Sequence, residues 1–146
     1  MLFRKTMEGN HASKRINTLL GALLVLDIVL SVVALFIPEF WSRVMHGVPY
    51  DDPQGLLRRT GATWVAFTLF QGIALARWRK EPFWLVVVAG LRWSEIITDW
   101  IYLYFCQDIT LFGRLGLFVS PPVNILAGWY LIKSYQHCSG QTSGRS

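Results

Sequence analysis

Four ionisable residues lie within apolar stretches of this 146-residue sequence, where they could support acid–base or ligand-binding chemistry. Asp27 interrupts the first apolar stretch, and Arg92, Glu95 and Asp99 interrupt the third. On a helix with about 100° per residue, Glu95 falls about 60° and Asp99 about 20° from Arg92. The three charges of the third stretch therefore form one stripe on a helix surface.

The apolar surroundings of this stripe predict that it faces protein or a water-filled cavity rather than lipid. A charge at the centre of a membrane span costs on the order of 3 kcal/mol, whereas an apolar residue returns only about 0.5 kcal/mol. Asp27 lies about as deep in the first span as Arg92 lies in the third, which favours an ion pair between them. Three buried acids against one base then require either an arginine from the outer helix ends or a proton on one carboxyl group. Glu95 and Asp99 are spaced to share such a proton.

From these residues we predict a polar site between helices that binds a small polar or amphipathic ligand, such as a lipid or quinone head group. The candidate ligand-binding residues are Asp27, Arg58, Arg59, Arg92, Glu95 and Asp99. Other interpretations of the same residues stay open. In one, the chain is an accessory or scaffold subunit whose charged stripe pairs with a partner helix. In another, the carboxylates translocate protons or ions, and in a third the ion pairs only fix the packing of the helices.

The elements that carry these residues are expected to be membrane-spanning helices. With 53% hydrophobic and 16% charged residues, the chain is too apolar for an ordinary soluble domain. A span needs roughly 20 mostly apolar residues, and four segments approach this length. We therefore expect an all-α, integral membrane four-helix bundle with spans at about 17–37, 57–77, 83–105 and 111–133. A cleaved signal peptide is the alternative interpretation of the first span.

The last span contains two consecutive prolines, Pro121 and Pro122. Proline removes a backbone donor and clashes with the preceding helical turn. The last helix is therefore expected to be kinked at these residues or broken into two shorter helices.

The segments outside the spans are polar. Residues 1–15 form a basic N-terminal segment, 16–136 the transmembrane domain, and 137–146 a polar tail that we expect to be disordered. Asp52 followed by Pro53 predicts the N-cap and the first residue of the second long helix. Apolar residues after the first span are spaced for a short helix in the membrane interface; they are Phe40, Trp41, Val44 and Met45.

The distribution of basic residues predicts the orientation in the membrane. If the N-terminus is cytoplasmic, the inner segments hold nine Lys and Arg residues and the outer segments hold four. Because positive residues favour the cytoplasmic side, we expect a multi-pass protein of the cell (inner) membrane with both termini in the cytoplasm.

Other classes of function have weaker support in the sequence. His11, His46 and His137 fall in a terminus, a loop and a tail, which argues against a metal or haem site. There is no Gly-rich phosphate loop, no CxxC and no sensible Ser-His-Asp arrangement. The basic pI of about 9.6 is explained by membrane topology rather than by nucleic-acid binding. We expect no cofactor and favour a non-enzymatic role, with the lipid bilayer, a membrane protein or a second copy of the chain as partners.

Three short motifs resemble those of small DoxX-like bacterial membrane proteins. They are Arg58-Arg59-x-Gly61, Ala89-Gly90-Leu91-Arg92 and Pro122-Val123-Asn124. The resemblance covers about half the chain, and Glu95 and Asp99 do not map onto it. It implies a four-helix membrane fold. DoxX-like proteins are functionally diverse, and some are associated with quinone or redox partners, so the resemblance implies a fold more than an activity.

Overall fold

A computed structural model describes residues 2–142, with side chains for 12–140. This part of the chain forms five α-helices and contains no strand, which confirms the all-α prediction. The helices are α1 (Leu2–Phe36), α2 (Pro38–Met45), α3 (Leu56–Arg77), α4 (Trp84–Phe105) and α5 (Leu111–Thr142).

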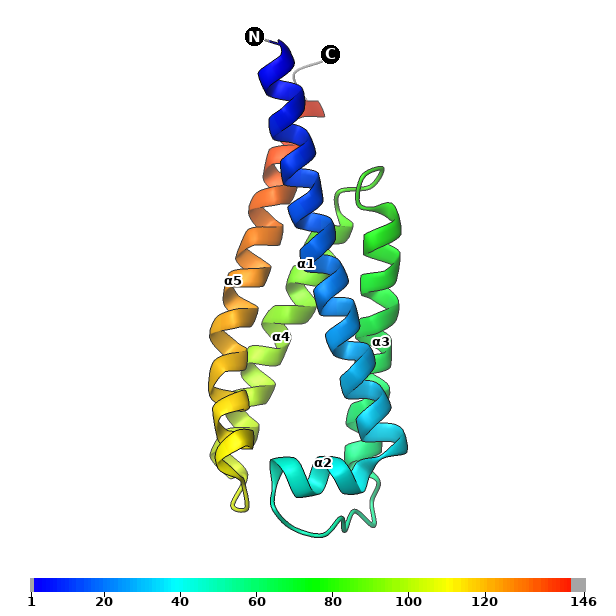
Figure 1. The fold of residues 1–146 in the computed structure, drawn as a ribbon, viewed down its shortest axis with the longest axis vertical. Helices are drawn as coiled ribbons and strands as arrows, with labels where there is room; N and C mark the ends of the chain where they lie inside the picture. The colour runs from blue at the N-terminus through cyan, green and yellow to red at the C-terminus, as the bar shows by residue number, and fades with distance from the viewer. Residues whose placement is uncertain (1, 143–146) are drawn as a thin grey trace.

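The four long helices run along the length of the molecule, and α2 crosses one end of it (Figure 1). Both termini and the α3–α4 turn lie at the other end, here called the terminal end; the end crossed by α2 is called the α2 end. Helix α1 packs mainly on α3, and α4 packs mainly on α5. The molecule is thus two helix pairs, which diverge toward the α2 end in Figure 1.

A compact apolar core joins the two helix pairs near the terminal end. Trp78, at the end of α3, donates its indole N–H to Asn17 Oδ1 of α1 at 2.8 Å. Burial of apolar side chains contributes roughly 25 cal/mol per Å² of apolar surface, so this core stabilises the packing of the two pairs. The core comprises Ile16, Leu20, Leu23, Ala74, Trp78, Leu85, Val88, Ala89 and Leu131.

Helix α2 connects the two pairs at the diverging end, and its presence confirms the short helix expected after the first span. Its last carbonyls bind the start of α5: Thr110 N–H donates to Met45 O at 2.9 Å, and Thr110 Oγ1 donates to Val44 O at 2.6 Å. A Cβ on Gly113 would lie 2.5 Å from Met45 O, so only glycine allows this approach. Helix α2 therefore fixes the spacing of the pairs where their direct contact is weakest.

The N-terminus of α3 differs in detail from the prediction. The helix begins at Leu56, and its N-cap is Gly55 in the left-handed conformation with φ 67°. Asp52 still caps the helix from three residues upstream, because its carboxylate accepts the backbone N–H groups of Leu56 and Leu57, each at 2.8 Å. The helix starts later than Pro53 because residues 52–55 form a turn in which Gly55 N–H donates to Asp52 O at 3.0 Å.

Helix α5 is continuous through Pro121 and Pro122, so of the two expected outcomes, a kink or a break into two shorter helices, the break is wrong. The prolines remove two backbone donors, but tertiary packing outweighs this loss. Pro121 is fully buried, and α5 packs extensively on α4. Near the middle of α5, a Cβ on Gly128 would clash with the indole of Trp93, so this side chain of α4 lies directly against the α5 backbone.

The C-terminal segment is helical as far as Thr142, whereas the sequence predicted a disordered tail over 137–146. The helix continues because Tyr135 and Cys138 pack on the core at the terminal end, which offsets the polar composition of the segment. Residues 143–146 lie outside the described part of the chain.

Within the described residues, two helical segments are long and apolar enough to cross a membrane: Ala12–Phe36 of α1 and Leu111–Gly140 of α5. Of the 18 most apolar consecutive residues in each segment, only 28% in α1 and 33% in α5 are buried, so most of these residues face the surface. The other two expected spans correspond to α3 and α4, which do not combine the length and the apolar composition of a candidate membrane span. Both carry polar and charged residues within the helix, such as Gln71 and Arg92, which the structure buries between helices.

Candidate functional site

The centre of the candidate site is an ion pair between Arg92 of α4 and Asp27 of α1. Their side chains are 1% and 0% exposed, and Arg92 Nη2 donates to Asp27 Oδ2. This contact confirms the pair expected from the equal depth of the two residues. Burial makes the pair mutually dependent, because removing one partner leaves an unpaired charge in a poorly solvated place.

A third helix contributes Gln71, which is fully buried in α3. Its Nε2 donates to Asp27 Oδ2 at 2.6 Å, so one carboxylate oxygen accepts bonds from both α3 and α4. Gln71 is thus an interhelical hydrogen-bond partner of Asp27. Asp27 thereby connects α1 to α3 within its own pair and to α4 of the other pair.

Glu95 lies one turn beyond Arg92 and binds the other side of the guanidinium. The Arg92 Nη1–Glu95 Oε2 distance is 3.0 Å, and Trp64 Nε1 of α3 donates to Glu95 Oε1 at 3.2 Å. The Arg92 guanidinium also lies 5.6 Å from the centroid of the Phe67 ring, a cation–π distance. Glu95 is 15% exposed and is therefore the partner of Arg92 nearer the surface.

Asp99 extends the polar cluster to α5. Its carboxylate hydrogen-bonds the Ser120 side chain, and Asn124 Nδ2 donates to Ser120 Oγ at 3.1 Å. Glu95 and Asp99 thus have different partners, Arg92 and Trp64 for the first and Ser120 for the second. All four long helices contribute to the polar cluster, which we define as Asp27, Trp64, Gln71, Arg92, Glu95, Asp99, Ser120 and Asn124.

Several buried polar atoms of the cluster have no hydrogen-bond partner among the described residues. They are Asp27 Oδ1, Gln71 Oε1, Arg92 Nε and Asp99 Oδ2. A buried unpaired polar group costs about 1–3 kcal/mol, so the cluster is not satisfied by packing alone. Asp99 is only half-buried, and its Oδ2 is the acceptor of this set closest to the protein surface.

Two of the six predicted site residues, Arg58 and Arg59, lie away from the cluster. Both are exposed in the first turn of α3. Arg59 is twelve residues before Gln71, which corresponds to about 18 Å along a helix. Arg114 of α5 is exposed as well. The alternative in which an outer arginine reaches the acids is therefore not observed, because these side chains begin too far from the buried carboxylates.

The sequence interpretation missed Trp64, Phe67 and Ser120. A usable signal existed for the first two, since Trp64, Phe67 and Gln71 are spaced by three and four residues and so share one helix face. Ser120 directly precedes Pro121 and Pro122. Its contact with Asp99 depends on the register between α4 and α5, which no local pattern specifies.

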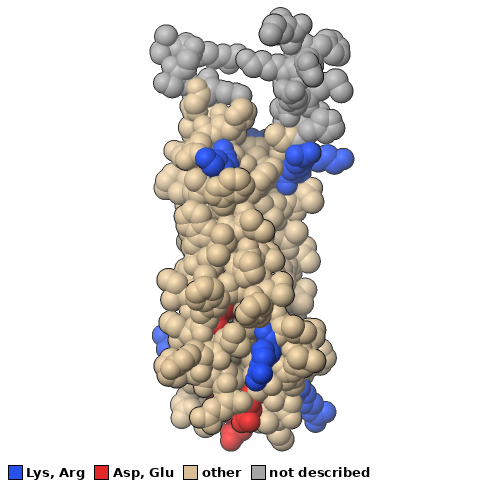
Figure 2. All heavy atoms as spheres, turned by 90° about the vertical axis from the view of Figure 1, so that its left-hand side faces the viewer, with Lys and Arg blue, Asp and Glu red and all other residues tan. Residues whose placement is uncertain are grey.

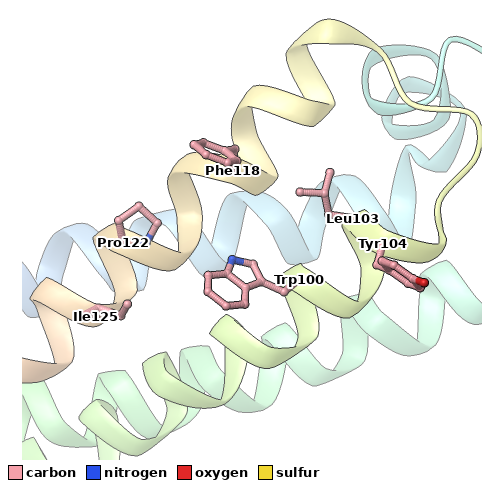
Figure 3. A pocket seen from close by; sticks show the side chains of 6 residues that line it. All are labelled: Trp100, Leu103, Tyr104, Phe118, Pro122 and Ile125. Atoms are coloured by element: carbon pink, nitrogen blue, oxygen red, sulfur yellow. The ribbon is translucent and has the colours of Figure 1, made fainter.

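A hollow lies between α4 and α5 on the surface, with a volume of about 730 Å³. Its lining comes from Trp100, Leu103 and Tyr104 of α4 and from Phe118, Pro122 and Ile125 of α5 (Figure 3). This hollow, here called the α4–α5 groove, includes none of the six predicted site residues. Its lining also includes no other residue of the polar cluster, and Ser120 lies about 200° around α5 from Phe118, on the other side of that helix.

No group of three or more His, Cys, Asp or Glu side chains within residues 12–140 is arranged to hold a metal ion. His46 instead joins elements at the α2 end. It is hydrogen-bonded to Asp108 O at 2.7 Å through Nδ1 and to Tyr102 Oη at 2.7 Å through Nε2. The arrangement ties the end of α2 to α4 and to the α4–α5 turn.

Comparison of the chain with protein-family models, with curated proteins and with solved structures found no match. The resemblance to DoxX-like proteins therefore stays a prediction. The fold and the site define an all-α protein with a buried acid–base cluster between four long helices.

Proposed function

We propose that this chain is a four-helix, multi-pass membrane protein that binds a small amphipathic ligand at its polar cluster. The ligand is of the size and kind of a lipid or quinone head group with an apolar body. In this proposal all four long helices cross the bilayer, and both termini lie in the cytoplasm.

The exposed side chains of the long helices support the membrane location. Much of the surface of α1, α4 and α5 consists of large apolar residues, whereas the buried set includes Asp27, Gln71, Arg92 and Asn124. Figure 2 shows one face on which the middle is largely uncharged and the Lys and Arg side chains lie toward the two ends. Apolar side chains outside and polar side chains inside are the reverse of the distribution in a soluble protein, and they match a surface that faces a bilayer.

The charges at the two ends support the proposed orientation. At the terminal end, the basic residues within 12–140 are Lys14, Arg15, Arg77, Arg79, Lys80 and Lys133, and Glu81 is the acidic residue of that range there. At the α2 end, Arg43, Arg58, Arg59 and Arg114 are balanced by Glu39, Asp51, Asp52 and Asp108. The excess of positive charge favours the cytoplasm for the terminal end.

The observation that carries the ligand proposal is the set of buried cluster atoms without a hydrogen-bond partner among the described residues, which are Asp27 Oδ1, Gln71 Oε1, Arg92 Nε and Asp99 Oδ2. Ligand sites typically combine an apolar hollow with a few convergent polar groups, and volumes of about 300–1,000 Å³ are usual. The polar cluster supplies convergent polar groups, and the α4–α5 groove is an apolar hollow of this size on two of the same helices.

The accessory-subunit alternative requires the charged stripe to pair with a helix of another protein. Arg92 already binds Asp27 and Glu95 within the chain, which leaves it no free charge for a partner. This internal pairing favours the ligand proposal.

Mass spectrometry of the protein purified in mild detergent tests the proposal. We expect an amphipathic small molecule to co-purify with the wild type and to be depleted in Asp99→Asn. Asp108→Asn is the matched control, because it makes the same charge change in the exposed α4–α5 turn. An unchanged set of bound molecules in Asp99→Asn, or a stoichiometric partner protein in every preparation, would count against the proposal.

A further inference from the structure

Arg114 of α5 lies at one end of the α4–α5 groove. The groove residues that come from α5 are Phe118, Pro122 and Ile125. On a helix with about 100° per residue, they fall about 40°, 80° and 20° from Arg114, so all four share one side of α5. Phe118 is one turn beyond Arg114, and side chains four residues apart on a helix meet. The Arg114 side chain therefore adjoins the groove at its Phe118 end.

Tyr104 brings a second polar group to the same end from α4. It belongs to the lining and is 82% exposed. Figure 3 shows its hydroxyl directed away from Trp100 and Ile125. Tyr104 lies in the last turn of α4 and Arg114 in the first turn of α5, so both lie at the α2 end of the groove. The rest of the lining is apolar or aromatic and comprises Trp100, Leu103, Phe118, Pro122 and Ile125.

The charge of Arg114 is not balanced within the described part of the chain. Its side chain is exposed, and none of the ion pairs within residues 12–140 includes it. A guanidinium binds a phosphate through two parallel hydrogen bonds, and a tyrosine hydroxyl can donate a further one. The polar end of the groove is therefore suited to a phosphate group.

The length of the site matches one leaflet of a bilayer. Arg114 and Ile125 are eleven residues apart, which corresponds to about 16 Å along a helix. The hydrocarbon core of a bilayer is about 30 Å thick, so this distance is about half of it. In the proposed topology the α2 end lies at the outer surface. A phosphate at Arg114 would then lie at that surface, and a chain in the groove would run toward the middle of the bilayer.

We infer that the α4–α5 groove binds an anionic phospholipid of the outer leaflet, with the phosphate at Arg114 and Tyr104 and one acyl chain along the groove. The unbalanced charge of Arg114 favours an anionic head group over a zwitterionic one. This inference rests on the membrane location in the proposed function. The site itself is separate from the polar cluster, because no residue of that cluster lines the groove.

Native mass spectrometry of the detergent-solubilised protein with two chain-matched lipids, dioleoylphosphatidylglycerol and dioleoylglycerol, tests this inference. The two lipids carry the same acyl chains, and only the first has a phosphate. We expect dioleoylphosphatidylglycerol to bind the wild type at least about fivefold more tightly. Arg114→Gln should remove most of this preference. Arg59→Gln makes the same change at an exposed position in the first turn of α3 and should retain it.

A second pair of variants tests the groove without changing a charge. Ile125→Trp adds bulk within the groove and should weaken the binding of both lipids by about fivefold or more, since an overpacked site excludes a ligand. Ile125 is exposed, so this variant is expected to fold. Ile97→Trp makes the same change on an exposed part of α4 outside the lining and should leave the binding of both lipids unchanged.

The outcomes separate the inference from the proposed function. Equal affinity of the wild type for the two lipids, full preference in Arg114→Gln, or unchanged binding in Ile125→Trp would overturn the inference. The ligand of the polar cluster would still stand, because its test is the depletion of a co-purifying molecule in Asp99→Asn. Conversely, if Asp99→Asn changes no co-purifying molecule and Arg114→Gln still removes the lipid preference, the cluster ligand fails and the phospholipid site stands. Loss of dioleoylphosphatidylglycerol binding in Asp99→Asn would contradict a separate site.

Discussion

Arg92 is the residue on which the polar cluster depends, because it alone carries positive charge among the three buried or half-buried acids. Its two terminal nitrogens are divided between Asp27 and Glu95. A guanidinium is suited to this arrangement, since its planar fork of donors can bind two carboxylates at once. Lysine at this position would offer only a point charge.

Replacement of Arg92 by Leu should lower the stability of the detergent-solubilised protein by about 3–5 kcal/mol, because Asp27 stays buried without its cation. The double variant Arg92→Leu/Asp27→Asn should recover part of the loss. Thermal unfolding of the wild type, both single variants and the double variant gives the coupling energy. Arg114→Leu, at an exposed position of α5, is the control for loss of a surface arginine. Strictly additive losses would mean that Asp27 and Arg92 are not coupled.

Gln71 allows a smaller perturbation of the same cluster. Gln71→Leu removes the 2.6 Å hydrogen bond to Asp27 Oδ2 while it keeps most of the side-chain volume. Loss of a hydrogen bond to a charged group costs about 1.5–3 kcal/mol, and we expect a destabilisation of that order in thermal unfolding. Thr63→Val removes a side-chain hydroxyl at an exposed position of the same helix and should change the unfolding temperature little. Equal stability of Gln71→Leu and wild type would show that the amide contributes no net stability.

At the residue scale, the sequence predicted which charged residues pair between helices, but it did not predict all the residues in contact with them. The Asp27–Arg92 pair followed from equal depth in two apolar stretches, and the burial of Arg92 followed from the cost of a charge in lipid. The role of Ser120 could not be predicted, because its contact with Asp99 is set by how α5 is registered against α4. Exposure of Arg58 and Arg59 follows from their position in the first turn of α3.

At the scale of the helices, boundaries could be predicted where the length of an apolar stretch sets them. The structure places α3 at Leu56–Arg77 and α4 at Trp84–Phe105, close to the expected 57–77 and 83–105. Local rules failed where tertiary contacts outweigh them. Pro121 and Pro122 do not end α5, because the helix packs on α4 along its length.

The N-terminus of α3 is stabilised by an acid whose ionisation can be titrated. Desolvation raises the pKa of Asp52, but the backbone N–H groups of Leu57 and Leu56 more than compensate and hold that pKa below its ordinary value of 3.8. A depressed pKa in the folded state gives stability that is present above the ordinary value and is lost as pH falls through the lowered one. The unfolding temperature should therefore fall as pH drops below about 4, and less so in Asp52→Asn. As a control, Asp51→Asn should show the same pH dependence of the unfolding temperature as the wild type. If Asp52→Asn also showed the wild-type pH dependence, Asp52 would not stabilise the N-terminus of α3 through its charge.

The close contact between α4 and α5 depends on a glycine. Gly128→Ala places a Cβ about where the Trp93 indole now lies, and overpacking of this kind costs typically about 1–3 kcal/mol. Gly116→Ala is the matched control in the same helix, since a Cβ there meets no atom within 4 Å; it should be neutral or slightly stabilising because alanine favours helix by up to about 1 kcal/mol. Thermal unfolding in one detergent compares the two. Equal stability of both variants would mean that Trp93 moves aside freely.

At the scale of the whole molecule, the polar cluster lies where the two helix pairs begin to diverge. The apolar core holds the pairs together at the terminal end, and α2 spans them at the other end. The charged groups occupy the region between, where each of the four long helices supplies a partner. If the four long helices cross a bilayer as proposed, this arrangement hides Gln71 of α3 and Arg92 of α4 from lipid, so neighbouring helices stabilise two helices that are too polar to insert singly.

The central claim is that all four long helices cross a membrane with the terminal end in the cytoplasm, and the side from which an engineered cysteine is labelled tests it most directly. In a background in which Cys106 and Cys138 are replaced by Ser, the variants Gln107→Cys and Lys80→Cys place one thiol in the α4–α5 turn and one in the α3–α4 turn, at opposite ends of the molecule. We expect a membrane-impermeant maleimide added to intact spheroplasts to label Gln107→Cys at once and Lys80→Cys only after permeabilisation. Labelling of both from the same side, or release of the protein from membranes by alkaline carbonate, would contradict the claim.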